Sequence, residues 1–229
     1  NWHHPGIAEK IREAIGLPVK IENDANAAAL AELWLGRPKI KNARDFILVY
    51  ITKGIGTGIV FDGEIYRGKN GVAGEFGHMT IGDNAPIACA AGSYRCWEAF
   101  ASERAAVARY NALTNKNNGT QSTNFSEIIS LAISGDEKAQ IALKETAKYI
   151  GIGISNLIQG LSPEMTLVAG KIVQVWDLVK DEINNSAVNS ICQGYPSVNI
   201  IPSTLGLSPT LKGAFSLILA NKFSLVRNA

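Results

Sequence analysis

One short segment of the chain, residues 74–98, gathers most of the side chains that could do chemistry. It holds carboxylates, the only histidine beyond the first four residues and a pair of cysteines, namely Glu75, His78, Cys89, Cys96 and Glu98. Ionised carboxylates accept hydrogen bonds from neighbouring hydroxyl groups, and an imidazole can donate one. The combination indicates recognition of a polyhydroxylated ligand. Taken singly, His78 could equally be a packed core imidazole, and Glu98 a solvated acid in the first turn of a helix.

The same segment offers three ligands to a metal ion. His78, Cys89 and Cys96 suit zinc, but a closed structural zinc site uses four ligands. No third thiol lies between the two cysteines, so Asp83 or a water molecule would have to complete the shell. The chain has three cysteines, an odd number, which argues against a disulfide framework and favours a reducing compartment. The residues leave open whether the pair binds zinc or has no metal role.

A second group of polar residues, Glu-Asn-Asp-Ala-Asn at 22–26, lies where a strand is expected to end and a helix to begin. Open α/β sheets bind ligands at the carboxyl ends of their strands, which would put Asn23 and Asp24 in the ligand crevice. A carboxylate there could take a proton from a bound hydroxyl group. An Asn or Asp before an alanine-rich helix is also a good N-cap, and the motif alone favours that interpretation.

A third motif is a glycine-rich stretch that follows a continuous apolar run. Phe46–Ile51 reads Phe-Ile-Leu-Val-Tyr-Ile and predicts a buried central strand. Residues 52–58, which come next, could cradle a phosphate with their backbone N–H groups, or could simply turn the chain. The candidate phosphate-binding residues are Lys53, Gly54, Gly56, Thr57 and Gly58.

The elements that must position these residues alternate between strand and helix patterns, which predicts an α/β fold. Besides Phe46–Ile51, strands are expected at 18–22, 59–61, 64–66, 165–169 and 198–201, with a hairpin turn at Asp62-Gly63. Helices are expected at 25–35, 97–113, 126–134, 137–161, 173–184 and 209–223. A polar loop at 115–124 separates the second helix from the third.

Composition narrows the class of function. The chain has 229 residues and a formal net charge of +2, which does not indicate a nucleic-acid groove or a membrane-surface patch. No apolar run reaches the roughly 18 residues of a membrane-spanning helix, and the first residues lack the pattern of a secretory signal. The sequence therefore predicts a cytoplasmic protein with a small, neutral ligand. The chain starts without methionine inside a helix pattern, so we expect a fragment of a longer protein.

Residues 51–78 carry a family resemblance. The run Ile-Thr-Lys-Gly-Ile-Gly-Thr-Gly-Ile-Val-Phe-Asp-Gly-Glu-Ile-Tyr-Arg-Gly-Lys-Asn-Gly-Val-Ala-Gly-Glu-Phe-Gly-His resembles the signature of the ROK family of repressors, open reading frames and sugar kinases. The resemblance implies an α/β, actin-like ATPase fold of the ribonuclease H-like type, with two domains and a sugar bound in the cleft between them. By the same resemblance, residues 1–22 are a remnant of the small domain or of the interdomain segment. Residues 23–229 are then the larger, C-terminal domain.

The resemblance also assigns roles to the residues singled out above. Asp24 matches the catalytic base, which takes a proton from the sugar hydroxyl group as that group attacks the γ-phosphate of ATP. The sugar-binding positions are Asn23, Asp24, Glu75, His78 and Glu98. Phosphate and nucleotide contacts are implied for the candidates within 53–58 and for Gly170, with ATP and Mg²⁺ as the cofactors of a kinase.

Three features depart from the kinase pattern. The Asp-Gly-Gly-Thr phosphate loop of the small domain is absent from this sequence. Lys53 occupies the threonine position of the second phosphate loop, which replaces a hydroxyl contact by a point charge. In the family's zinc pattern, Cys-x-Cys-Gly-x-x-Gly-Cys, Ala91 and Arg95 stand where the middle cysteine and the second glycine belong. The metal site is therefore expected to be incomplete.

The family divides into sugar kinases and sugar-responsive repressors. Lys53 and the stretches 96–102 and 168–177 look more like the repressor branch, whereas Asp24 points to the kinases. We expect the sugar-binding effector domain of a transcriptional regulator, which binds a hexose or pentose. The alternative is an ATP-dependent sugar kinase of the glucokinase or N-acetylhexosamine kinase type. The resemblance implies a homodimer without membrane contact, which reaches DNA only through an N-terminal winged helix not included in this sequence.

Overall fold

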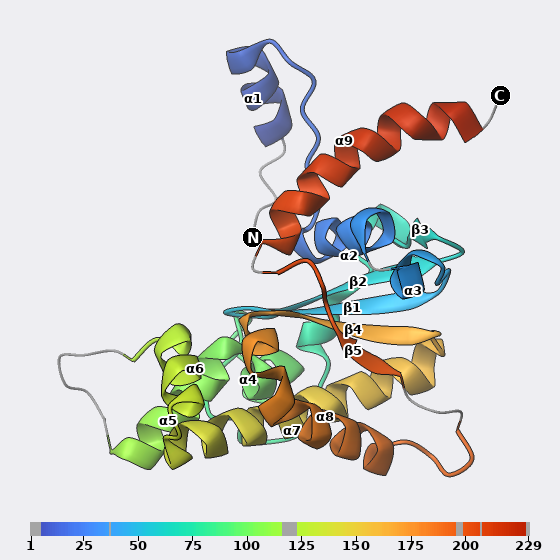
Figure 1. The fold of residues 1–229 in the computed structure, drawn as a ribbon. Helices are drawn as coiled ribbons and strands as arrows, with labels where there is room; N and C mark the ends of the chain where they lie inside the picture. The colour runs from blue at the N-terminus through green and yellow to red at the C-terminus, as the bar shows by residue number, and fades with distance from the viewer. Residues whose placement is uncertain (1–5, 37, 116–122, 196–198, 207, 228–229) are drawn as a thin grey trace.

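The computed structural model describes residues 6–36, 38–115, 123–195, 199–206 and 208–227. These residues form a mixed α/β structure in which one five-stranded sheet separates two layers of helices (Figure 1). The strands are β1 (Phe46–Ile51), β2 (Ile55–Phe61), β3 (Glu64–Ile65), β4 (Met165–Gly170) and β5 (Ile200–Pro202). The α-helices are α1 (Ile7–Ile15), α2 (Asp24–Leu35), α3 (Pro38–Lys41), α4 (Trp97–Ala101), α5 (Glu103–Thr114), α6 (Phe125–Ile133), α7 (Glu137–Leu161), α8 (Trp176–Ser190) and α9 (Pro209–Arg227).

The sheet has the order β3-β2-β1-β4-β5, with β1 at its centre as expected. Strand β1 pairs antiparallel with β2, and it pairs parallel with β4 so that Ile51 lies opposite Gly170. Five of the six residues of β1 are buried, which explains why the strand is a continuous apolar run and not an alternating one. The carboxyl ends of β1 and β4 therefore meet at one edge of the sheet.

The helices α4 to α8 cover one face of the sheet, and α7 is the longest of them (Figure 1). A Cβ atom added at Gly153 of α7 would lie 1.9 Å from the ring of Trp97, so only glycine lets the first turn of α4 approach this closely. The indole nitrogen of Trp97 donates to the Tyr149 carbonyl oxygen at 2.8 Å. This packing fixes α4, which carries Glu98.

The helices α2, α3 and α9 cover the opposite face (Figure 1). Five of the 12 residues of α2 are alanines and all five are buried, so the helix axis can lie close to the sheet. A Cβ atom at Gly58 of β2 would lie 2.5 Å from the Ala25 carbonyl oxygen and 2.6 Å from the Ala29 side chain. The start of α2 is therefore held against β2.

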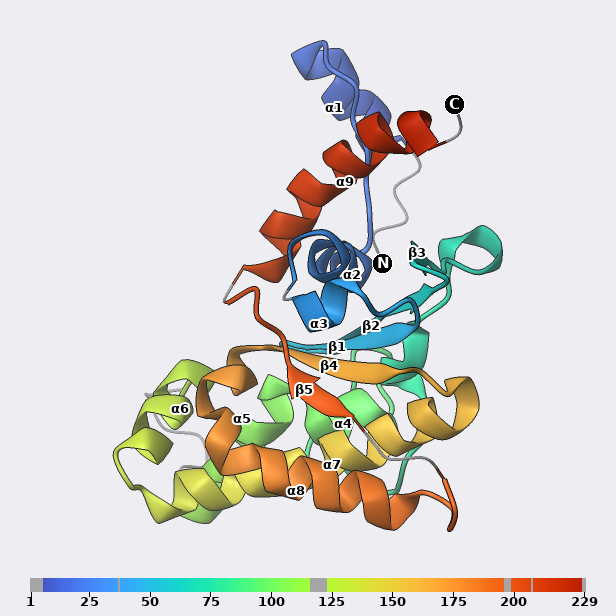
Figure 2. The ribbon, with the colours of Figure 1, turned by 45° about the vertical axis from the view of Figure 1, so that its right-hand side comes forward.

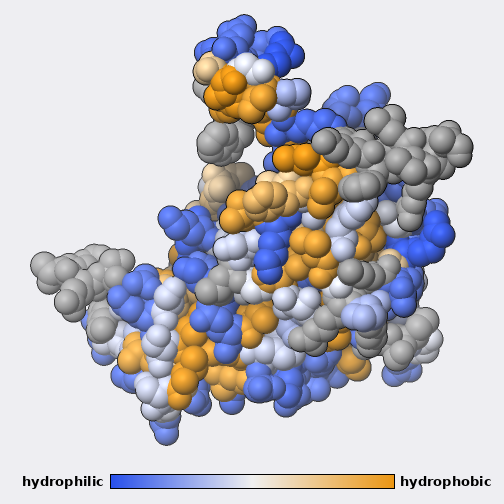
Figure 3. Space-filling model, turned by 45° about the horizontal axis from the view of Figure 1, so that its top comes forward, coloured by the Kyte–Doolittle hydropathy of each residue, from blue (hydrophilic) through white to orange (hydrophobic). Residues whose placement is uncertain are grey.

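Helix α1 projects from this layer in both ribbon views (Figures 1 and 2), and none of its residues is buried. Its apolar side chains and those of α9 form exposed surface, visible on both helices in Figure 3. The strand expected at 18–22 is wrong, because this stretch pairs with no strand of the described residues and its Ile21 is 59% exposed. An alternating pattern makes a strand only where a neighbouring strand accepts it.

Other differences concern element ends. The helix expected at 97–113 is interrupted at Ser102, whose side chain accepts a hydrogen bond from the Ala105 N–H and caps α5. Strand β2 begins at Ile55, so Gly56, Thr57 and Gly58 belong to a strand and only residues 52–54 form the turn. Residues 116–122 of the expected polar loop, and residue 198 of the last expected strand, lie outside the described residues.

Among the described residues, no helix combines the length and apolarity needed to cross a lipid bilayer.

Candidate functional site

Asn23 and Asp24 both lie at the amino end of α2. The Asn23 side-chain oxygen accepts hydrogen bonds from the N–H groups of Ala25 at 2.9 Å and Asn26 at 3.1 Å, so Asn23 is the N-cap of the helix. Asp24 Oδ1 also accepts from the Ala25 N–H, at 2.9 Å. Both residues remain exposed. Capping and ligand contact are thus compatible at this position.

Asp24 and Glu98 approach the same short stretch of backbone, the turn into β2. A Cβ atom at Gly56 would lie 3.7 Å from Asp24 Oδ1, and one at Gly54 would lie 2.5 Å from Glu98 Oε2. Gly54 therefore leaves room for the Glu98 carboxylate, and Gly56 lets the start of α2, which carries Asp24, approach β2. Residues 74 apart in the sequence meet here because α2 and α4 both pack on β2.

The 3-10 turn Glu75–His78 lies against the same strand. A Cβ atom at Gly74 would lie 2.4 Å from the Thr57 carbonyl oxygen, and one at Gly77 would lie 2.2 Å from the Ile55 carbonyl oxygen. The Thr57 hydroxyl group donates to the Gly74 carbonyl oxygen at 2.6 Å. Glu75 and His78 are both exposed on this turn. The predicted sugar-binding residues thus belong to segments that all pack on the turn before β2 or on the start of β2.

Glu98 is 6% exposed, so it is not the solvated acid that a first-turn position could indicate. Its Oε1 accepts from the Ala90 N–H at 2.8 Å, and its Oε2 accepts from the Ile55 N–H at 3.3 Å. The carboxylate therefore ties the cysteine-containing loop to β2. Its structural role is visible, whereas a sugar contact at Glu98 stays a prediction.

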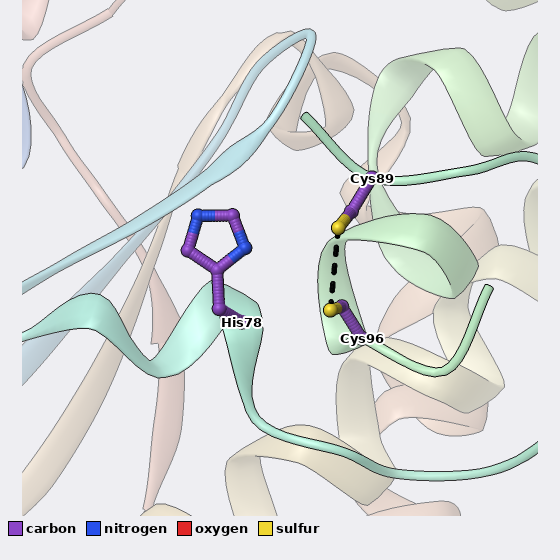
Figure 4. Close-up of side chains that lie close together, drawn as sticks. All are labelled: His78, Cys89 and Cys96. Atoms are coloured by element: carbon purple, nitrogen blue, oxygen red, sulfur yellow. Dashed lines mark hydrogen bonds between the residues drawn. The ribbon is translucent and has the colours of Figure 1, made fainter. Parts of the chain in front are cut away.

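The potential metal ligands also meet. The ligand atoms of His78, Cys89 and Cys96 lie within 4.8 Å of one another, and the two sulfur atoms point toward each other at 3.3 Å (Figure 4). Both thiols are buried, whereas His78 is exposed. Asp83, which could have completed the shell, forms an ion pair with Arg95 at 2.7 Å and does not belong to this cluster. One imidazole and two thiols fit three of the four positions of a zinc ion.

The two thiols differ in acidity. Burial disfavours a charge on Cys89, but hydrogen bonds to its sulfur from Cys96, the backbone of Ser93 and Ala91, and His78 together lower its pKa to about 7. For Cys96, burial raises the pKa, and the neighbouring Cys89 raises it further. The pair therefore holds one thiolate more readily than two.

The predicted phosphate-binding residues separate into two groups. Lys53 is exposed in the turn after β1, and Gly170 (φ 112°) ends β4 directly beside it in the sheet, where a Cβ atom would lie 1.9 Å from the Ile51 carbonyl oxygen. Gly56 and Gly58 instead face the alanines of α2. Gly54 faces Glu98, and Thr57 bonds to Gly74. The glycine-rich motif thus serves helix packing as much as any phosphate.

Sequence reasoning missed a pocket of about 620 Å³ next to Lys53, lined also by Glu103, Phe125 and Lys171 among others. One signal was present, since Lys171 lies two residues after the end of the predicted strand 165–169, at the edge where open sheets bind ligands. Nothing in the sequence places Glu103 in the same pocket.

A mixed sheet of this order between two helical layers, with acidic and glycine-rich segments around its hairpin, defines a domain of the actin-like ATPase class found in sugar kinases. The model of the ROK family matches residues 1–221, and the chain belongs to this family.

Relatives come from both branches. The chain is 31% identical over 231 residues to the xylose repressor of Bacillus spizizenii, covering 99% of this chain and 57% of that protein. It is 33% identical over 231 residues to a glucokinase of Streptomyces coelicolor, covering 95% of this chain and 72% of that protein. The structure is similar to that of a ROK family glucokinase from Streptomyces griseus in complex with glucose and AMPPNP, with a TM-score of 0.84 and 28% identity, covering 95% of this chain and 73% of that one. This chain therefore spans little more than half of the repressor's length.

Proposed function

We propose that this chain is the sugar-binding effector region of a ROK transcriptional regulator and that it binds a hexose or a pentose. The observation that carries the proposal is the packing of the segments that hold Asp24, Glu75, His78 and Glu98 on one stretch of β2. Exposed carboxylates and an imidazole there can accept from and donate to vicinal hydroxyl groups. The xylose repressor relative supports a pentose as the first ligand to test.

Lys53 favours the regulator over the kinase. The side chain is exposed in the turn where the resemblance places a threonine in the kinases, so the hydroxyl contact to a phosphate is missing. A regulator needs only that sugar binds one conformation better than another, because such a preference shifts the population toward that conformation. It does not need a nucleotide in place.

The wider assembly follows from the same proposal. Residues 1–22 would belong with a small domain, and the exposed apolar side chains of α1 and α9 would pack against it. DNA contact would come from an N-terminal module, and the regulator would work as a homodimer.

A sugar kinase is the second candidate, and the exposure of Asp24 favours it. The Asp24 carboxylate lies exposed at the amino end of α2, where it can reach a hydroxyl group of a ligand, as a catalytic base must. A kinase would use ATP and Mg²⁺. Sugar-dependent ADP formation by the full-length protein would decide for the kinase, whereas sugar-dependent loss of operator binding without ADP formation would decide for the regulator.

Calorimetry with the full-length protein tests the sugar site itself. We expect D-xylose or D-glucose to bind the wild type. Asp24→Asn should weaken binding at least about tenfold, because the amide replaces one of the two acceptor oxygens of the carboxylate by an NH₂ donor. Asp181→Asn is the matched control, since Asp181 is an exposed helical acid on α8. Equal sugar affinity in the Asp24→Asn variant, or no binding of any pentose or hexose by the wild type, would contradict the proposal.

A further inference from the structure

The pocket beside Lys53 has a mixed charge that the proposed regulator function does not require. It opens at the carboxyl ends of β1 and β4 and is bordered by α5 and α6. Its lining residues are Lys53, Ile87, Glu103, Arg104, Val107, Ala108, Asn111, Thr123, Asn124, Phe125 and Lys171. The cations among them would attract a phosphate, and Glu103 is the single acid of this lining.

Backbone contacts bring the charges together. The parallel register of β1 and β4 sets Ile51 beside Gly170, so Lys53 and Lys171 leave the same edge of the sheet. The Glu103 N–H group donates to the Thr52 carbonyl oxygen at 2.9 Å, which anchors the amino end of α5 next to Lys53. Lys171 Nζ donates to the Ser126 hydroxyl oxygen at 3.0 Å, at the start of α6. The backbone of Glu103 is therefore fixed next to Lys53, and its side chain lines the pocket.

The carboxylate of Glu103 is half-buried and lies in the field of both lysines. Burial raises the pKa of Glu103, and the charges of Lys171 and Lys53 lower it in part. The attraction is mutual, so the lysine charges are partly compensated before any ligand arrives. Arg104 is turned toward the protein, since its Nη2 donates to the Ala88 carbonyl oxygen at 3.2 Å.

A neutral acceptor in the same lining has no partner. The Asn111 side-chain oxygen is buried and, within the described part of the chain, makes no hydrogen bond. A buried carbonyl oxygen without a partner is unfavourable, and a ligand N–H or O–H group would satisfy it. The Asn111 end of the pocket therefore favours a neutral hydrogen-bond donor over an anion.

We propose that Glu103 determines the ligand specificity of this pocket, which takes small neutral or singly charged molecules and disfavours polyphosphates such as ATP. A triphosphate that reached Lys53 and Lys171 would bring its negative oxygens next to the Glu103 carboxylate. Repulsion between neighbouring like charges is costly in a partly buried site. The inference deepens the proposed function on which it rests, since it names the residue that separates this pocket from a nucleotide site. The family's ATP does not fit the residues present.

The test compares nucleotide binding by variants of the full-length protein. Binding of AMPPNP with Mg²⁺ and of neutral adenosine is measured by calorimetry at low and high salt. Glu103→Gln should strengthen AMPPNP binding roughly tenfold at low salt, leave adenosine unchanged, and lose most of the gain as salt screens the charges. Glu103→Ala should show the same gain, which separates the removed charge from any effect of the glutamine side chain.

Glu137→Gln is the matched control, because Glu137, like Glu103, is an acid in the first turn of a helix, but it is exposed and does not line the pocket. It should leave AMPPNP binding unchanged. Equal or weaker AMPPNP binding by both Glu103 variants would overturn the proposal, the weaker result showing that Glu103 helps to hold Mg²⁺. Sugar binding is measured on the same samples and tests the proposed function separately. If the wild type binds no sugar, the proposed function fails, but the effect of Glu103 on AMPPNP binding can still be measured.

Discussion

The two sides of the β1–β2 hairpin are built in different ways. On the side of Asp24 and the 3-10 turn, backbone meets backbone, and glycines at 58, 74 and 77 leave no space for any side chain. At the end of β1 and β4, long side chains such as Lys53 and Lys171 surround an open pocket. The first side can hold several polar groups in fixed positions, as recognition of a defined sugar requires. On the second side, the charges of the lining side chains determine which ligands bind, and single substitutions can change those charges without altering the backbone.

The strongest test of the rigid side is Gly153→Ala. The added methyl group would overlap the Trp97 ring at 1.9 Å, so we expect a loss of about 3 kcal/mol in the free energy of unfolding and displacement of α4. Gly160→Ala on the same helix is the control, because nothing lies within 4 Å of its added Cβ atom, and it should be neutral or stabilising by up to about 1 kcal/mol. Chemical denaturation measures both. Equal stability of the two variants would show that α4 is not held as described.

Removing the acceptor that joins loop and sheet should have a smaller effect. Glu98→Gln keeps one acceptor oxygen but turns its NH₂ group toward the N–H of either Ile55 or Ala90, and two donors cannot pair. We therefore expect a loss of about 1–3 kcal/mol in the free energy of unfolding. Sugar affinity should fall with it, because the loop and β2 are no longer tied together. Urea unfolding measures the first effect and calorimetry the second. A variant as stable as the wild type would contradict the bridging role.

The metal prediction sharpens the contrast within the rigid side. If His78, Cys89 and Cys96 hold zinc, elemental analysis of the purified protein should find about one zinc per chain. Cys89→Ser should reduce that content, and Cys192→Ser, which changes an exposed cysteine outside the cluster, should not. Protein without zinc that still binds sugar would mean that packing alone orients His78.

The smallest expected effect is on proton binding in metal-free protein. The pKa of Cys89, about 7, lies below its ordinary value of 9.0. The folded state should therefore gain stability as the pH rises from about 7 to 9 and lose this contribution as the pH falls through 7. Thiolate absorbance should show a step near pH 7 that Cys89→Ser removes. A single step near pH 9 would contradict the hydrogen bonds described around Cys89.

The elements that sequence predicts best are those whose pattern is long or fully buried. Strand Phe46–Ile51 and helix Glu137–Leu161 have the predicted ends, because a continuous apolar run and an amphipathic stretch of many turns leave few alternatives. The predicted strand at 18–22 failed because a strand needs a partner, which local sequence cannot supply.

For the site, sequence identified residues but not their neighbours. Glycines at 56 and 58 are explained by Ala25 and Ala29 of α2, a contact between distant segments of the chain that composition does not reveal. Glu103 was missed for a similar reason. Its place beside Lys53 and Lys171 depends on the register of β1 and β4, which are separated by more than 100 residues.

The most direct test of the central claim is a crystal structure of the full-length protein with its sugar bound. We predict that the sugar lies at the start of β2, with hydroxyl groups within hydrogen-bond distance of Asp24 and of at least one of Glu75 and His78. A sugar bound elsewhere on the protein, with these side chains turned away from it, would contradict the account.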